Sequence, residues 1–230
     1  VCSSDLTYVV AGIITDVIPN VIADGITVYA DAVFGAAVVE PSLLDAWAGT
    51  LAYTFQIYFD FSGYSDMAIG LAFLFGITLP INFASPYKST SIIDFWRRWN
   101  MTLSRFLRDY LYIPLGGNRR RNSRCHVHLI ITMLLGGLWH GAHWNFVIWG
   151  ALHGLFLLVN HGWREIRNRI LGERKFSASS RYNAGTLAWL LTFFCVVVAW
   201  VFFRAETSAG ALSLLAAMTS LEALVVPDAY

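Results

Sequence analysis

The chain has 230 residues, of which 57% are hydrophobic and only 13% are charged, and its mean hydropathy is +0.55. Soluble domains carry roughly a quarter of charged residues, so the composition argues against an ordinary soluble protein. The net charge of +1 says little, but the distribution of charged residues is informative, because residues 1–87 contain no Lys or Arg. At about 20 residues per crossing, we expect five or six membrane-embedded segments. The predicted fold class is all-α, a polytopic integral membrane helical bundle.

The first third of the chain holds three apolar stretches. Residues 7–45 are interrupted by acidic residues, which is typical of one embedded or interfacial segment followed by a loop. Residues 47–61 and 64–79 are each shorter than a usual crossing, and Ser62-Gly63 separates them. Pro80 is expected to end the helical pattern, because proline cannot continue a helix.

The segment DFWRRWNMTLSRFLRDYLYIPLGG, residues 94–117, predicts an amphipathic helix. At 100° per residue its apolar side chains share one arc and its arginines the other. Asn100 is the exception, because it falls within the apolar arc between Trp96 and Leu103. Its amide either hydrogen-bonds a neighbouring backbone group or has a function.

Residues 125–161 lie between two basic stretches, Arg119–Arg124 and Arg164–Arg181. Basic loops favour the cytoplasmic side, so the apolar residues between them must cross an even number of times. As helix they extend about 55 Å, enough for two short crossings. The stretch GGLWHGAHWNFVIWG, residues 136–150, then forms the turn and the returning arm of a hairpin.

Two apolar segments follow the hairpin. Residues 185–203 carry no charge and predict the cleanest crossing in the chain. Residues 208–226 are interrupted by Ser and Glu222 and are expected to be interfacial.

His140 is the sharpest functional candidate, because polar groups inside hydrocarbon are costly unless satisfied. Gly136 and Gly137 precede it by one helical turn, which leaves room for either a packed helix or a substrate. A neutral imidazole, with an ordinary pKa of about 6.5, can accept a proton from a hydroxyl as a general base. The alternative is a hydrogen-bonded structural histidine.

Metal and nucleic-acid binding are both disfavoured. Four of the six histidines stand at suggestive spacings: His140, His143, His153 and His161. Zinc sites normally add Cys or a carboxylate, yet no acidic residue lies between Asp109 and Glu165. The arginine clusters flank apolar spans, where they act as topology determinants and lipid contacts. We therefore expect no metal and no nucleic-acid partner.

Three long motifs carry a family resemblance. They are FQIYFDFSGYSDMAIGLAFLFGITLPINFASPY (55–87), FWRRWNMTLSRFLRDYLYIPLGGNR (95–119) and GGLWHGAHWNFVIWGALHG (136–154). In this order they resemble the membrane-bound O-acyltransferase (MBOAT) family, nearest to its alginate O-acetyltransferase branch. The resemblance covers about residues 47–206. Family members are about twice this length, so residues 1–230 are expected to form one membrane-embedded domain of a partial MBOAT fold, a fragment lacking N-terminal and C-terminal helices.

The resemblance also implies site residues. The essential histidine of the family's Trp-His-Gly motif falls on His140, and its second site position falls on Asn100. Many bacterial relatives carry His at that second position. An amide can donate a hydrogen bond to an oxyanion but cannot take a proton at neutral pH, so this departure leaves the role of Asn100 open.

The implied activity is O-acyl transfer in the bacterial cytoplasmic (inner) membrane. A thioester donor, acyl-CoA or an acyl carrier protein, would give an acetyl or short acyl group to a hydroxyl of an exported polysaccharide or a periplasmic acyl-relay protein. The donor is a substrate, and no cofactor is expected. The isolated fragment is expected to be inactive.

Four charged residues are weaker candidates for substrate or donor binding. Arg105 and Arg108 would attract the phosphates of the donor. Asp60 and Asp66 would either line the cavity or pair with an arginine. The competing hypothesis for the whole chain is a transporter or channel subunit, in which the same buried His and Asn line a solute path; donor turnover distinguishes the two.

Overall fold

The computed structural model describes residues 21–35, 41–117, 124–171 and 178–220, and these are helical or loop without any strand. The predicted all-α class is thereby confirmed for this part of the chain. The residues group into two compact units, which are described separately: a first unit of Val1–Asn82 with Arg204–Tyr230, and a second unit of Phe83–Phe203.

The first unit contains a helix over residues 21–34, α2 (Leu43–Leu74) and α8 (Ser208–Ala217). The Ser42 hydroxyl caps α2 by accepting a hydrogen bond from the N–H of Asp45 at 3.2 Å. The Trp47 indole donates to the carbonyl of Met218 at 3.0 Å, which ties the start of α2 to the end of α8.

The interruption predicted at Ser62-Gly63 is wrong, because α2 is one continuous helix of 32 residues. Both residues are buried, and the Ser62 hydroxyl bonds back to the carbonyl of Phe59. Their small side chains therefore serve packing, which overrides their weak helix propensity. The helix ends at Leu74, before Pro80. Gly76 follows two residues later with a φ of +71°, which is typical of a glycine that terminates a helix.

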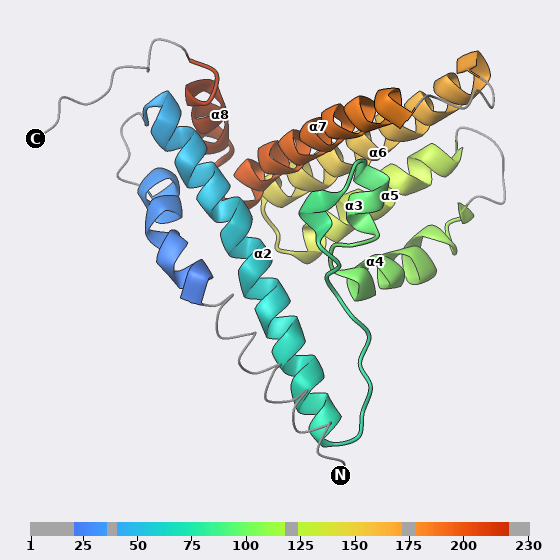
Figure 1. The fold of residues 1–230 in the computed structure, drawn as a ribbon, viewed down its shortest axis with the longest axis horizontal. Helices are drawn as coiled ribbons and strands as arrows, with labels where there is room; N and C mark the ends of the chain where they lie inside the picture. The colour runs from blue at the N-terminus through green and yellow to red at the C-terminus, as the bar shows by residue number, and fades with distance from the viewer. Residues whose placement is uncertain (1–20, 36–40, 118–123, 172–177, 221–230) are drawn as a thin grey trace, which may run out of the picture. The chain divides into compact units, whose positions relative to one another are not determined.

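The second unit carries the remaining helices in the order shown in Figure 1. They are α3 (Ile92–Trp96), α4 (Met101–Leu107), the π-helical segment η2 (Arg108–Tyr112), α5 (Arg124–Trp139), α6 (Trp144–Leu171) and α7 (Ala178–Arg204), after a 3₁₀ turn η1 (Pro86–Lys88). The helix α6 packs against both α5 and α3, and η2 packs against α5.

The predicted hairpin is confirmed, with α5 and α6 as its arms and residues 140–143 as its turn. The arms approach closely through glycines. A Cβ at Gly137 would collide with the carbonyl oxygen of Phe146, and one at Gly150 with the carbonyl oxygen of Met133. Of the two uses considered for Gly137, the structure therefore supports helix packing. Gly141 has a φ of +151°, a value that favours glycine.

The continuous helix predicted over residues 94–117 is wrong, because the chain breaks between α3 and α4. Asn100 adopts left-handed backbone angles, with φ 38° and ψ 63°. Asparagine tolerates this conformation better than most residues. The Arg98 carbonyl accepts a hydrogen bond from the N–H of Ala84 at 3.0 Å, and the Arg98 guanidinium pairs with Asp94 at 3.0 Å. The hydrogen bond from Ala84 to Arg98 is a tertiary contact and the Arg98–Asp94 pair is local; periodicity alone reveals neither.

Two helices among the described residues are long and apolar enough to cross a membrane, Trp144–Ile170 and Gly185–Arg204. The second coincides with the crossing predicted over residues 185–203. Cys125–Trp139 and Ser208–Ala217 are shorter apolar helices. The five or six embedded segments expected from composition remain a prediction.

Candidate active site

His140 lies at the tip of the α5–α6 hairpin. Its backbone N–H closes the end of α5 on the carbonyl of Gly137 at 3.0 Å. Because α5 begins at Arg124, His140 is separated from the arginine-rich start of the hairpin by the whole length of that helix, about 24 Å. The hairpin therefore presents the imidazole at the end opposite to the basic flank.

Aromatic packing fixes the His140 ring. The ring lies edge-to-face against Trp149 at 5.3 Å and Phe203 at 4.9 Å between centroids, and it is only half-buried. Neither ring nitrogen has a hydrogen-bond partner among the described residues. The imidazole is thus positioned without its nitrogens being used, which leaves both of them able to meet a ligand.

Asn100 is placed by the backbone break rather than by a helix face. Its carbonyl accepts the N–H of Ser104 at 3.0 Å and so begins α4. Its side-chain amide makes no hydrogen bond to the described residues, including the neighbouring backbone groups considered as its partners. The amide is half-buried and retains its full hydrogen-bonding capacity.

No hydrogen bond joins Asn100 to His140 among the described residues, but aromatic rings connect the neighbour of Asn100 with His140. Trp99, which precedes Asn100, contacts Trp200 of α7 at 5.0 Å between centroids. Trp200 contacts Phe203 at 5.3 Å, and Phe203 in turn contacts His140. Two rings therefore separate the neighbour of Asn100 from the imidazole.

His153 lies at the centre of this aromatic cluster and is fully buried. Its ring stacks on Phe95 and meets Trp149 at 4.9 Å and Trp96 at 5.1 Å. Within the described residues, neither of its nitrogens has a hydrogen-bond partner, and the same holds for the indole nitrogens of Trp96, Trp149 and Trp200. Each buried polar group left unpaired costs about 1–3 kcal/mol, so this cluster is expensive for a purely structural core.

A pocket of about 530 Å³ opens beside the aromatic cluster, between α3, α4, η2, α5 and α6. Three arginines line it: Arg97, Arg105 and Arg108. Its apolar walls include Trp96 and Met133. The volume is in the range of small-molecule sites, and the combination of cationic rim and apolar wall suits an anionic ligand with an uncharged arm.

The three arginines of the pocket are not equivalent. Arg108 donates two hydrogen bonds to Asp109, at 2.7 and 3.2 Å, and these bonds hold the pKa of the Asp109 carboxyl below its ordinary value. Arg97 and Arg105 make no ion pair with any described residue. Their exposed guanidinium groups are therefore the stronger anion-binding candidates.

One stripe of α6 joins the pocket to His140. Its residues recur every four positions: Trp149, His153, Leu157 and His161. Each step advances about 6 Å along the helix, on nearly the same face. Leu157 and His161 line the pocket, whereas Trp149 touches His140. His153 occupies the position between them.

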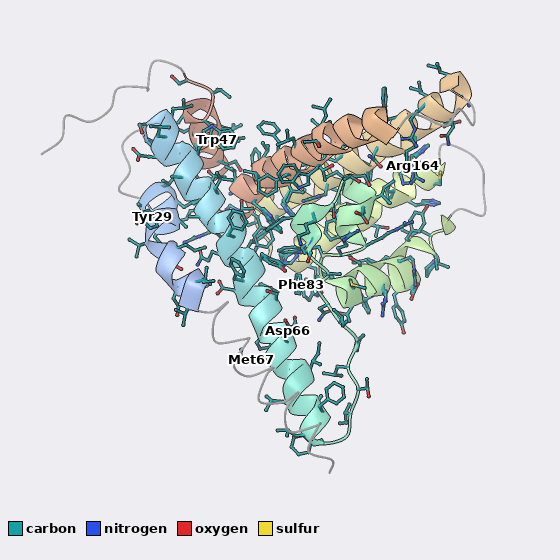
Figure 2. All side chains as sticks on the ribbon, viewed as in Figure 1. Tyr29, Trp47, Asp66, Met67, Phe83 and Arg164 are labelled. Carbon is teal, nitrogen blue, oxygen red and sulfur yellow. The ribbon has the colours of Figure 1, made fainter. Side chains whose placement is uncertain are left out.

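The predicted site residues fall into separate groups. The pocket lining includes Arg105 and Arg108 but neither His140 nor Asn100. Asp60 and Asp66 belong to α2 of the first unit, where Asp60 is half-buried and Asp66 is exposed. Figure 2 labels Asp66 on this helix. Neither acid forms an ion pair with a described residue, so their role remains a prediction.

The described residues contain no group of three or more His, Cys, Asp or Glu side chains that could hold a metal ion. Sequence reasoning placed Arg97 on the arginine face of residues 94–117 without selecting it as a site residue, and it did not select the indole nitrogens of the tryptophans. The four-residue spacing on α6 was the available signal for His153, since it aligns that residue with Trp149 and His161.

The helical fold, the apolar spans and the composition define the class of helical membrane proteins. The family model of the membrane-bound O-acyltransferase family matches residues 7–203, and the chain belongs to this family. The resemblance of the three motifs is thereby confirmed.

The curated relatives modify bacterial polymers according to their names. A peptidoglycan O-acetyltransferase of Helicobacter pylori is 50% identical over 201 residues, 87% of this chain and 36% of the relative. A probable alginate O-acetylase AlgI of Azotobacter vinelandii is 49% identical over 199 residues, 86% of this chain and 37% of the relative. A teichoic acid D-alanyltransferase of Streptococcus thermophilus is 38% identical over 130 residues, which are 54% of this chain and 31% of the relative. The chain thus spans about a third of the length of these relatives.

Proposed function

We propose that the full-length protein is a membrane-bound O-acyltransferase that moves an acetyl or other short acyl group from a thioester donor to a hydroxyl of an exported polymer. The observation that carries this proposal is His140, an imidazole fixed by packing at the tip of a hairpin with both nitrogens unused, in a chain of the acyltransferase family. The three relatives named above support a polymeric acceptor.

His140 acts as the general base in this proposal. Its neutral imidazole takes the proton of the acceptor hydroxyl, and the hydroxyl oxygen forms a bond to the thioester carbonyl carbon. The tetrahedral intermediate then breaks its C–S bond, and the proton passes from the imidazolium to the departing thiolate. The products are an ester and a free thiol, so no cofactor is consumed.

Asn100 acts by hydrogen bonding. Its amide N–H₂ donates to the developing oxyanion or orients the acceptor hydroxyl, and it does not titrate. The unused amide at the α3–α4 break supports this role, because the left-handed backbone fixes where the side chain starts.

The arginine-lined pocket receives the phosphate-bearing part of the donor. Acetyl-CoA and an acyl carrier protein share a phosphopantetheine thioester, and guanidinium groups bind phosphate well. The pocket lies beside the part of the hairpin nearer its basic flank, which the positive-inside rule assigns to the cytoplasm. The acyl group then passes along the hairpin toward His140, and the protein is a multi-pass protein of the bacterial cytoplasmic membrane.

The test of the activity uses the full-length protein in liposomes. It is supplied with radiolabelled acetyl-CoA, or with acetylated carrier protein in a parallel arm, and with polysaccharide from the source cell envelope. Thiol release coupled to label in the polymer is expected in one arm. Solute movement across the bilayer with neither thiol release nor ester formation would instead favour the transporter hypothesis.

Replacing Arg105 with Glu is expected to raise the donor KM by about tenfold while leaving kcat within about twofold. A hydrogen bond to a charged group contributes roughly 1.5–3 kcal/mol, and a tenfold change corresponds to about 1.4 kcal/mol. Arg108→Glu is expected to raise KM less, because Asp109 already neutralises part of its charge. Initial rates at varied donor concentration measure both constants.

Arg169→Glu is the matched control for that series. Arg169 is an exposed arginine of α6 outside the pocket lining, and its only described partner is Glu165. Its replacement is expected to leave the donor KM unchanged. An unaltered KM in Arg105→Glu would remove the pocket from the donor-binding proposal.

A further inference from the structure

The buried cluster around His153 has hydrogen-bonding groups that no described residue satisfies. The imidazole offers one donor and one acceptor in its neutral form, and the indoles of Trp96, Trp149 and Trp200 offer three N–H donors. All three indole rings contact the imidazole, so the unpaired groups belong to one place in the fold. A phenylalanine at position 153 would fill the same space, stack on Phe95 and remove the two unpaired imidazole nitrogens.

The cluster lies on the route between the two parts of the proposed site. On α6, His153 stands one turn from Leu157, which lines the arginine pocket, and one turn from Trp149, which touches His140. A donor with its phosphates on the arginines and its acyl group near His140 must therefore place its thioester close to this stripe.

We propose that His153, together with the indole N–H groups of Trp149 and Trp200, binds the carbonyl oxygen of the acyl thioester. This inference rests on the proposed function and adds a carbonyl-binding site to it. The N–H donors polarise the C=O bond, and they hold the oxyanion that forms when the acceptor oxygen attacks. When the C–S bond breaks, the carbonyl is restored on the ester product and the same donors release it.

Trp96 separates this site from the pocket. Its indole lines the pocket and also contacts His153 at 5.1 Å, so a single aromatic ring stands between the two. Trp96 is the last residue of a five-residue helix and lies four positions before the left-handed Asn100. On this proposal, displacement of this one side chain admits the thioester to the site.

The direct test is infrared spectroscopy of a bound carbonyl. The probe is a methyl ketone analogue of S-acetyl-4′-phosphopantetheine, with CH₂ in place of sulfur and ¹³C at the carbonyl carbon. Added to full-length protein in nanodiscs, it is expected to show a carbonyl band at lower frequency than in buffer. His153→Phe is expected to abolish the shift and His153→Gln, which keeps an N–H donor, to restore part of it.

Kinetics and stability complete the test. His153→Phe is expected to lower kcat for acetyl transfer by about 100-fold, the size typical of losing an oxyanion donor, with the donor KM within about threefold. Its thermal midpoint should equal or exceed that of the wild type, because the two buried imidazole nitrogens without a partner among the described residues are removed. His126→Phe, on an exposed histidine of α5 outside the stripe, should change neither kcat nor the band.

The outcomes separate this inference from the proposed function. An unshifted band in the wild type, or a wild-type kcat in His153→Phe, overturns the carbonyl site even when acyl transfer is observed. A shifted band that depends on His153, in a protein without acyl transfer, supports the site and refutes the proposed reaction.

Discussion

Replacing His140 with either Ala or Phe is expected to reduce acyl transfer by about 10²–10⁴-fold, the usual contribution of a general base. The two variants differ in packing but not in chemistry. Phe keeps a ring against Trp149 and Phe203, whereas Ala removes it. A loss common to both therefore reports on proton transfer. Single-turnover thiol release from labelled donor, in the full-length protein, measures the rate.

His143→Asn is the control for the His140 variants. His143 belongs to the same turn, is exposed, and accepts the N–H of Asn145 through Nδ1 at 3.3 Å. Asn keeps an acceptor for that bond while removing the imidazole, so full activity is expected. If His140→Phe is active whereas His140→Ala is not, His140 serves packing alone and is not the general base.

Replacing Gly150 with Ala is expected to destabilise the protein by about 1–3 kcal/mol, the usual cost of overpacking. The added methyl group meets the carbonyl oxygen of Met133 and lies 3.2 Å from the Cα of Leu134, both of them backbone that a side-chain movement cannot relieve. The two arms of the hairpin must then separate, which also displaces His140 at its tip. The thermal midpoint in detergent, followed by fluorescence-detected size-exclusion chromatography, is expected to fall.

Gly162→Ala provides the comparison within the same helix. A Cβ at Gly162 meets no described atom within 4 Å, so Ala there is expected to be neutral or to stabilise α6 by up to about 1 kcal/mol through helix propensity. Equal midpoints for the two variants would contradict the close approach of α5 and α6.

The hairpin could be predicted from the sequence because local signals agree there. An apolar run flanked by arginines at both ends must return to its starting side, and the glycines around position 140 allow the turn. The candidate span over residues 185–203 could be predicted equally well, since hydropathy alone identifies an uncharged apolar helix of that length.

The break at Asn100 could not be predicted in the same way. Periodicity assumes one backbone conformation throughout, and the apolar residues on both sides of Asn100 fit one arc whether or not the chain turns left-handed between them. The structure adds two contacts of Arg98 beside the break, a tertiary hydrogen bond from the N–H of Ala84 and a local ion pair with Asp94. The continuity of α2 could not be predicted from local sequence either. Ser62 and Gly63 are residue types common in loops, but here they are buried inside a continuous helix.

The pocket depends on residues that are distant in sequence. Arg97 and His161 both line it, and only the packing of α3 and η2 on the hairpin brings them together. Sequence reasoning selected Arg105 and Arg108 for their charge, but the pairing of Arg108 with Asp109 and the participation of Arg97 required coordinates.

The four-residue spacing on α6 also constrains how this helix can evolve. Apolar residues facing lipid can be exchanged freely, since hydrocarbon distinguishes little among them. A single insertion or deletion between Trp149 and His161 would leave the hydropathy of the helix nearly unchanged. It would nevertheless rotate the residues beyond it by about 100°, so that the residues lining the pocket would no longer share a face with the residue that contacts His140. On the proposed mechanism, the distance between the pocket and His140 therefore fixes the length of this segment, while hydropathy constrains its composition.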